Sequence, residues 1–185
     1  MAIIFVILIV VSIGAAAVLI PLSRTARISD IQVINVDGTG GIALVVYHPG
    51  ISSFHEDVTL AFVDGLVSND WRVELTTASE QTPANLSGYD LLVLGGPGYG
   101  DEPAVPVTEY VSRVGDFGGI ETVLIITAAG SGAAAMDILE TQVQETNATV
   151  VLSLLLYLIS PNEEQYGSTD PLEIATNAGE ELPLP

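Results

Sequence analysis

Three loops built from small residues are the places where this chain could bind a ligand. Their sequences are HPGISS (48–53), GGPGYGDEP (95–103) and AAGSG (128–132), and each follows an apolar run. Small residues let backbone amides approach a ligand closely, and a loop that opens a helix presents free N–H groups to an anion. Because none of the three loops contains Lys or Arg, we expect these amides and the hydroxyls of Ser52 and Ser53 to hold any phosphate.

The other residues that could do chemistry form neither a catalytic set nor a metal-binding set. The chain has no cysteine, and its two histidines are His48 and His55. We expect His48 to be a polar loop residue and His55 to lie on the exposed part of its helix, which does not favour a metal pair. Ser131 lies between two glycines, but a serine hydrolase needs a histidine base and none follows His55. We therefore predict no catalytic residue and no metal site.

The loops alternate with segments that have the patterns of buried strands and amphipathic helices. Continuous apolar runs predict strands of a parallel sheet, and apolar residues at helical spacing predict helices. The predicted strands are 42–47, 71–78, 91–94, 122–127 and 149–159, and the predicted helices are 54–66, 108–114, 136–145 and 170–182. A helix between Glu80 and Ser87 is expected to be short or absent. Right-handed crossovers turn this order into a three-layer α/β/α fold with a five-stranded parallel sheet.

The predicted strand order is 2-1-3-4-5, and it places the three loops at one edge of the sheet. In open sheets of this kind, ligands bind just beyond the carboxyl ends of the strands. The middle loop carries an aromatic residue, Tyr99, among its glycines. Tyr99 would either contact a ligand at that edge or cap the sheet as an ordinary surface aromatic, and the sequence leaves both roles open.

The loop pattern resembles that of the flavodoxin family over about Ile42 to Leu182. In that family the loop after the first strand commonly reads like SRTGNT and cradles the phosphate of FMN. The loop after the third strand reads like GSPTYGGxPAxP and flanks the isoalloxazine ring. The second loop here matches this pattern over Gly95–Gly100 and again over Pro103–Pro106, and residues 129–132 are similar to the third flavin loop. The resemblance implies that Tyr99 stacks on the ring.

The same resemblance implies a non-covalently bound FMN that serves electron transfer or the reduction of a small acceptor. The first loop departs from the pattern, because Gly50 replaces the threonine and Ile51 the glycine. That departure favours a second possibility, which is a flavin-free docking or regulatory module at the membrane. The implied cofactor-binding residues are His48, Gly50, Ser52, Ser53, Gly96, Pro97, Gly98, Tyr99, Gly100, Ala129, Gly130, Ser131 and Gly132.

The amino-terminal segment predicts one transmembrane helix. Residues 2–22 contain no charge, and this uninterrupted apolar stretch would span about 31 Å as a helix, which matches a bilayer core. A cleavable signal peptide is the alternative, but no positive charge precedes the apolar run. Arg24 and Arg27 follow it, so the positive-inside rule places the rest of the chain in the cytoplasm. Residues 23–41 are predicted to be a juxtamembrane linker, either a spacer or an added edge strand, before the domain at 42–182.

The charge balance restricts the partners that this protein can bind. The chain has 23 Asp and Glu against 4 Lys and Arg, and all four cations are arginines. Residues 28–185 carry all 23 acids and only two arginines, which gives a formal net charge of −21. Such a surface repels nucleic acid and anionic lipid headgroups. It suggests a high-salt cytoplasm, where counterions screen its self-repulsion, and a merely acidic protein is the alternative. Besides the lipid bilayer, we expect a redox protein or a quinone as the partner.

Overall fold

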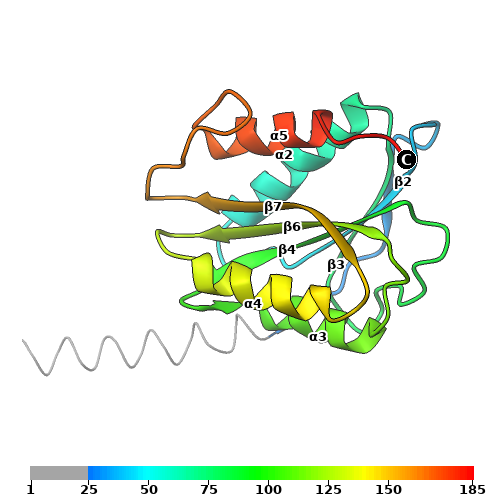
Figure 1. Cartoon of the computed structure of the whole chain (residues 1–185), viewed down its shortest axis with the longest axis horizontal. Coiled ribbons are helices and arrows are strands. Elements are labelled where there is room, and N and C mark those ends of the chain that lie inside the picture. The colour runs from blue at the N-terminus through cyan, green and yellow to red at the C-terminus, as the bar shows by residue number, and fades with distance from the viewer. Residues whose placement is uncertain (1–24) are drawn as a thin grey trace, which may run out of the picture.

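A computed structural model describes residues 25–185, and these form three layers, with a sheet between two pairs of helices. Helices α2 (Phe54–Ser68) and α5 (Pro171–Glu180) cover one face of the sheet. Helices α3 (Val105–Val114) and α4 (Ala133–Gln144) cover the other face (Figure 1). The predicted span at 2–22 lies outside the described residues. Within residues 25–185, no helix is long and apolar enough to cross a bilayer.

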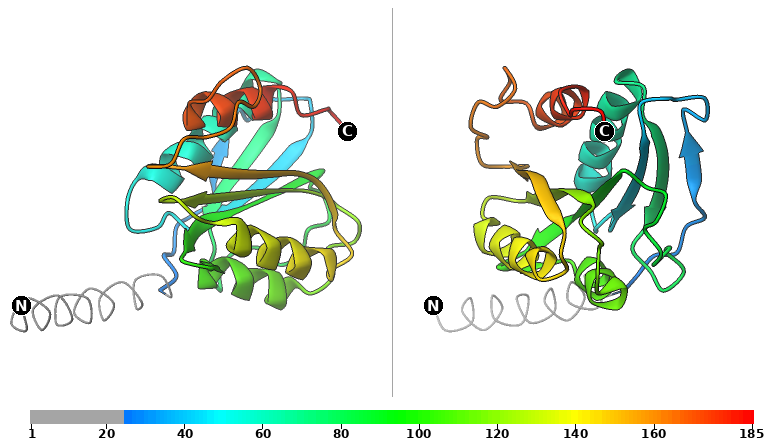
Figure 2. Two further views of the ribbon diagram at one scale, coloured as in Figure 1. Left: turned by 60° about the vertical axis from the view of Figure 1, so that its left-hand side comes forward. Right: turned by 45° about the vertical axis from the view of Figure 1, so that its right-hand side comes forward.

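The sheet has the predicted strand order, with additions at one edge and at one strand end. Its strands run β1-β3-β2-β4-β6-β7, and the five strands from β3 to β7 in this order pair in parallel. Strand β1 pairs antiparallel with β3 at the outer edge (Figure 2), and β5 pairs antiparallel with the end of β4. The bounds are β1 Gln32–Ile34, β2 Ile42–Tyr47, β3 Arg72–Thr77, β4 Leu91–Tyr99, β5 Glu102–Pro103, β6 Glu121–Ala128 and β7 Thr149–Tyr157.

The central strands are apolar on both faces because both faces are covered by helices. Alternate residues of β2 show the division, since Val45 packs toward α2 and α5 whereas Leu44 and Val46 pack toward α3 and α4. All three side chains are completely buried. At about 25 cal/mol per Å² of apolar surface, each such side chain contributes roughly 1.5–3 kcal/mol to folding. Strand β7, at an edge, is less covered: its first residues alternate between exposed and partly covered, and only Leu154 and Leu156 are fully buried.

Several boundary predictions are confirmed in detail. Asp170 caps α5, because its side chain accepts hydrogen bonds from the amides of Leu172 and Glu173 at 2.9 and 3.2 Å. Pro171 occupies the first helical position, as expected from its fixed φ angle. Residues 80–87 form no helix, and the segment is instead a series of bends and turns. The edge strand that the sequence left open is present as β1, within the predicted linker range.

Helices α2 and α5 touch through two glycines. A Cβ atom on Gly65 would collide with the carbonyl oxygen of Thr176 and would lie 2.9 Å from the amide nitrogen of Glu180. A Cβ atom on Gly179 would collide in the same way with the carbonyl oxygen of Phe62. The two backbones therefore approach more closely than any other residue type permits. This contact holds α2, whose amino terminus opens beside the first loop, against the last helix of the described chain.

We expect Gly65→Ala to destabilise the domain, although alanine normally stabilises a helix relative to glycine by roughly 0.5–1 kcal/mol. The added methyl group forces the two helix backbones apart, and overpacking of this kind costs about 1–3 kcal/mol. Denaturant unfolding followed by circular dichroism in high salt measures the change. Asp64→Ala, at the exposed neighbouring position of α2, is the matched control and should leave the unfolding midpoint nearly unchanged. A Gly65→Ala variant as stable as the parent would contradict the close contact.

Candidate functional site

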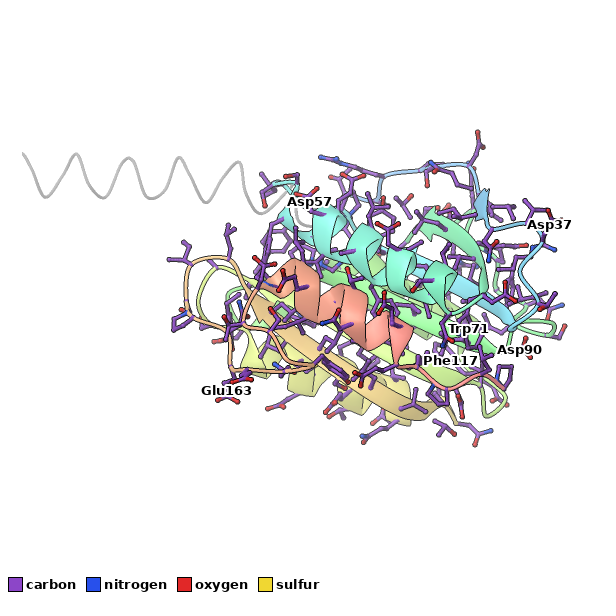
Figure 3. All side chains as sticks on the ribbon, turned by 90° about the horizontal axis from the view of Figure 1, so that it is seen from above. Asp37, Asp57, Trp71, Asp90, Phe117 and Glu163 are labelled. Carbon is purple, nitrogen blue, oxygen red and sulfur yellow. The ribbon has the colours of Figure 1, made fainter. Side chains whose placement is uncertain are left out.

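The chain changes direction between β2 and β4, and this is where the fold opens. From β2 the chain crosses over α2 to β3 on one side, whereas from β4 it crosses over α3 to β6 on the other. The loops after β2 and β4 therefore diverge, which leaves a crevice beyond the carboxyl ends of these strands. Figure 3 shows Asp57 at the end of α2 that faces this edge, and Trp71 beyond its other end.

A crevice of about 180 Å³ lies at this edge of the sheet. It brings together the three predicted loops, because each of them contributes to its walls. Four lining residues were not among the predicted site residues, and none carries a sequence signal for a ligand: Phe54 at the start of α2, Thr127 and Ala128 at the end of β6, and Leu158 after β7. The lining residues are Ser52, Phe54, Pro97, Gly98, Tyr99, Thr127, Ala128, Ala129 and Leu158.

Tyr99 closes one side of this crevice. Strand β4 continues past its predicted end at Leu94 and turns back as a short hairpin, in which Tyr99 pairs with Glu102. The Tyr99 side chain leans over the first loop, so that its hydroxyl lies 3.5 Å from the position of a Cβ atom on Gly50. The hydroxyl is buried and has no hydrogen-bond partner of good geometry among residues 25–185. Burial raises the pKa of Tyr99, and the amide of Ile51 opposes that rise.

The first loop presents hydroxyls and amides to the same edge. Gly50 has a φ angle of +84°, and its missing side chain leaves room for Pro97, whose Cγ would lie 3.0 Å from a Cβ atom there. Ser52 and Ser53 are exposed, and Ser53 occupies the N-cap position without using its hydroxyl to cap α2. The first amides of α2 have no partners within the helix, so they are free for an anion. The nearby carboxylates of Glu56 and Asp57 oppose that binding electrostatically.

His48, at the start of the first loop, is buried instead of lying open as a polar loop residue. Only 1% of its surface is exposed, and both ring nitrogens lack hydrogen-bond partners within the described chain. Its backbone amide donates to the Gly95 carbonyl at 2.9 Å, which fixes it beside β4. Burial, with a smaller contribution from the charge of Arg27, lowers the pKa of His48 to about 4. An unpaired polar ring in this position costs stability, although His48 is not among the residues that line the crevice.

The prediction that His55 lies on the exposed part of its helix is wrong. Its side chain is 1% exposed, with Nδ1 3.0 Å from the Thr127 hydroxyl and Nε2 3.3 Å from the Thr59 hydroxyl. The physical reason is the contact between α2 and strand β4, where Gly95 has no side chain. A Cβ atom there would lie 2.9 Å from Nε2 of His55, so the ring fills the space that the glycine leaves. Burial lowers the pKa of His55 to about 3, which keeps the ring neutral.

The remaining predicted residues are not all at the crevice. Gly96 lies on the opposite face, where a Cβ atom would contact Ala104 and Val107 of the α3 layer at 3.0 and 3.2 Å. Gly100 is exposed at the tip of the β4–β5 hairpin. Of the predicted residues in the third loop only Ala129 lines the crevice, whereas 130–131 are exposed and Gly132 is buried outside its lining. No group of three or more His, Cys, Asp or Glu residues within 25–185 could hold a metal ion.

We expect His48→Leu to be at least as stable as the parent protein at pH 7, because it replaces a buried ring with two unpaired nitrogens by an apolar side chain. The folded pKa of about 4 lies below the ordinary 6.5, so the unfolded chain binds the proton first as pH falls. The parent should therefore lose stability relative to His48→Leu between pH 6.5 and 4, by about 1 kcal/mol per pH unit. Unfolding curves without added ligand, measured across this range, provide the test. If the unfolding free energies of the parent and of His48→Leu changed equally with pH, the lowered pKa of His48 would be contradicted.

The chain was compared with known proteins at the level of sequence and of structure. No protein-family model and no curated protein sequence matches it. Solved structures do match, each with a low sequence identity. A flavodoxin from the domain Archaea is 17% identical with a TM-score of 0.59, and the match covers 76% of this chain and 94% of that one. Flavodoxin 2 from Bacillus cereus, in its oxidised form, is 21% identical with a TM-score of 0.61, covering 74% and 94%.

A third structure extends the comparison to an enzyme. The NAD(P)H:quinone oxidoreductase from Methanothermobacter marburgensis is 16% identical with a TM-score of 0.51, and the match covers 77% of this chain and 99% of that one. The matches cover nearly the whole lengths of these three structures. The described chain therefore has a flavodoxin-like fold, of the type found in flavoproteins.

Proposed function

We propose that this protein binds FMN non-covalently and either carries electrons or reduces a small acceptor. The observation that supports this most directly is the crevice at the switch between β2 and β4, which is walled by three small-residue loops and by Tyr99. FMN would supply the redox chemistry itself. The protein would supply the binding site, the orientation of the ring and the electrostatic surroundings.

The residues at the crevice fit the two ends of an FMN molecule in different ways. The ring end has apolar and aromatic surface from Tyr99, Pro97 and Leu158, next to the small residues Gly98 and Ala129. Such surface suits a flat aromatic ring, and the free backbone amides of the loops suit the polar edge of that ring.

The phosphate end fits the first loop and the start of α2. The hydroxyls of Ser52 and Ser53 are exposed, and the first amides of the helix have no partners within it. His48 adds a buried polar ring without a partner beside the same loop. We propose that these hydroxyls, amides and the ring bind the phosphate as hydrogen-bond donors.

The exposed carboxylates of Asp101 and Glu102 would shape the redox behaviour. They lie on the β4–β5 hairpin next to Tyr99, and neither is buried. Negative charge at this place disfavours an anionic reduced flavin, so it would lower the reduction potential. With the net acidic surface of the chain, it also favours a partner that is cationic or uncharged.

The membrane attachment is part of this proposal. Residues 2–22 would span the bilayer once, and Arg24 and Arg27 would place the domain in the cytoplasm. Anchoring would confine the crevice near lipid-soluble acceptors, so a quinone or a membrane-bound redox protein is the proposed partner. A quinone oxidoreductase has a similar fold, so the fold is compatible with such a reaction, but this similarity does not assign the acceptor. The acidic composition supports a protein that works in high salt.

A flavin-free docking or regulatory module is the second candidate, and one observation favours it. The crevice of about 180 Å³ is smaller than the roughly 300–1,000 Å³ of ordinary ligand pockets. The Tyr99 ring, which leans over Gly50, limits this volume. FMN binding therefore requires Tyr99 to turn away from the first loop, whereas the flavin-free module keeps it in place.

The full-length chain, purified in detergent and high salt, should be yellow and release about one equivalent of FMN, because one crevice per chain has the required loops. An absorption spectrum, followed by release and quantification of the flavin, makes the measurement. If the protein is colourless, FMN should be titrated into it under the same conditions. A protein that takes up no FMN in that titration would support the flavin-free module instead.

We expect Tyr99→Ala to weaken FMN binding roughly fivefold, since an aromatic stacking contact contributes about 1 kcal/mol. Tyr99→Phe is the matched control, because it keeps the aromatic ring and removes only a hydroxyl that has no hydrogen-bond partner of good geometry among residues 25–185. Its affinity should equal that of the parent. Fluorescence quenching of FMN during titration gives both dissociation constants, and equal values for the alanine variant and the parent would count against ring contact by Tyr99.

A further inference from the structure

The segment just before β1 is fastened to the carboxyl end of β3. The hydroxyl of Thr77 donates to the carbonyl of Arg27, and the amide of Thr77 donates to the Ser29 hydroxyl at 3.0 Å. The Thr76 hydroxyl donates to the Ser29 carbonyl at 3.2 Å. These bonds span nearly fifty positions of sequence, and Thr76 and Thr77 are almost fully buried. Residues 27–29 are therefore held in a fixed place at the edge where the strands end.

That place is beside the first loop. Thr77, which holds Arg27, is the register partner of Tyr47, and Tyr47 directly precedes the loop at 48–53. The amide of Ala78 continues this pairing by donating to the Tyr47 carbonyl at 2.8 Å. Burial raises the pKa of Tyr47 and of Tyr99 and lowers that of His48; the charge of Arg27 opposes the two rises and adds to the fall, so it acts on both candidate loops. The candidate site therefore has a cation beside it that comes from outside its three loops.

The guanidinium of Arg27 is exposed and uncommitted, in contrast to those of the two other described arginines. Arg72 forms an ion pair with Glu74 at 2.9 Å. Arg113 donates to the carbonyls of Ser79 and Thr82 at 3.1 and 2.7 Å. Within residues 25–185, the Arg27 guanidinium forms no ion pair, and the only hydrogen bond of Arg27 is through its backbone carbonyl. Its charge remains available to an anion.

The site itself needs such a charge. The first loop contains no Lys or Arg, and the first turn of α2 carries Glu56 and Asp57, which repel an anion. Among residues 25–185, both ring nitrogens of the buried His48 lack hydrogen-bond partners, so the first loop also contains an unpaired polar group. Two independent features, the free cation of Arg27 and the unpaired buried ring of His48, thus favour the binding of an anion near the first loop.

We propose that Arg27 binds the phosphate of FMN together with the amides at the start of α2. This inference rests on the proposed function and adds a residue that none of the three loops contains. The guanidinium offers several donors in a planar fork, which matches phosphate oxygens better than the point charge of a lysine. The positive charge of Arg27 also offsets the negative charges of Glu56 and Asp57 in the first turn of α2. The retention of FMN then depends on the Thr76–Thr77 clamp that holds residues 27–29 in place.

Titration of the full-length protein with FMN and with riboflavin, which lacks the phosphate, separates this contact from the rest of the site. Arg27→Gln should weaken FMN binding roughly tenfold and leave the riboflavin affinity unchanged. Arg72→Gln removes the same charge at the far end of β3 and is the matched control, with both affinities unchanged. Thr77→Val, which loses the clamp and keeps the charge, should weaken FMN selectively by a smaller factor. The FMN affinity of Arg27→Gln should also depend less on salt.

The outcomes distinguish the two proposals. Equal FMN affinities for the parent and Arg27→Gln would overturn the role of Arg27 while leaving FMN binding in place. A parent protein that binds neither FMN nor riboflavin would overturn both. Equal losses of FMN and riboflavin affinity in Arg27→Gln would show a general disturbance of the site and would also overturn the phosphate contact. Because Arg27 is exposed, its substitution should leave the unfolding midpoint unchanged, which circular dichroism checks.

Discussion

The burial of β2 and β4 on both faces is the constraint on which the rest of the structure depends. These neighbouring strands pair in parallel, and their side chains pack into two separate apolar clusters, one under each helical layer. A parallel pair needs a crossover to return the chain, and a doubly covered sheet needs crossovers on both faces. The direction of crossing therefore has to change somewhere, and it changes between these two strands. The candidate site follows from this requirement before any particular side chain is considered.

The buried strands and the helices that cover them could be predicted from the sequence, because a long apolar run is stable only when it is buried. The central strands, the four helices and the N-cap at Asp170 all belong to this class. Strand β1 could not be decided, since three residues are too few to show a period. The end of β4 was also missed, because Gly98 and Tyr99 extend the strand with residues that are typical of a turn.

The candidate site was predictable at the level of loops and less so at the level of side chains. The small-residue loops do converge, because parallel strands end at one edge. The burial of His55 depends on Gly95, forty positions away, and no local pattern contains that dependence. The place of Arg27 depends in the same way on Thr77. Electrostatics at the site is therefore set by long-range contacts, while its shape is set by local sequence.

The glycine contact between α2 and α5 has a consequence for the order in which the protein matures. Helix α2 follows directly on the first loop, and it packs both on the sheet and along α5, which lies more than a hundred residues later in the chain. During synthesis, α2 therefore lacks its contact with α5 until residues 171–180 have emerged from the ribosome. The packing of the helix that this loop opens is therefore complete only at that late stage. Acquisition of a ligand at this edge would then be a post-translational event, with the last helix acting as the closing element.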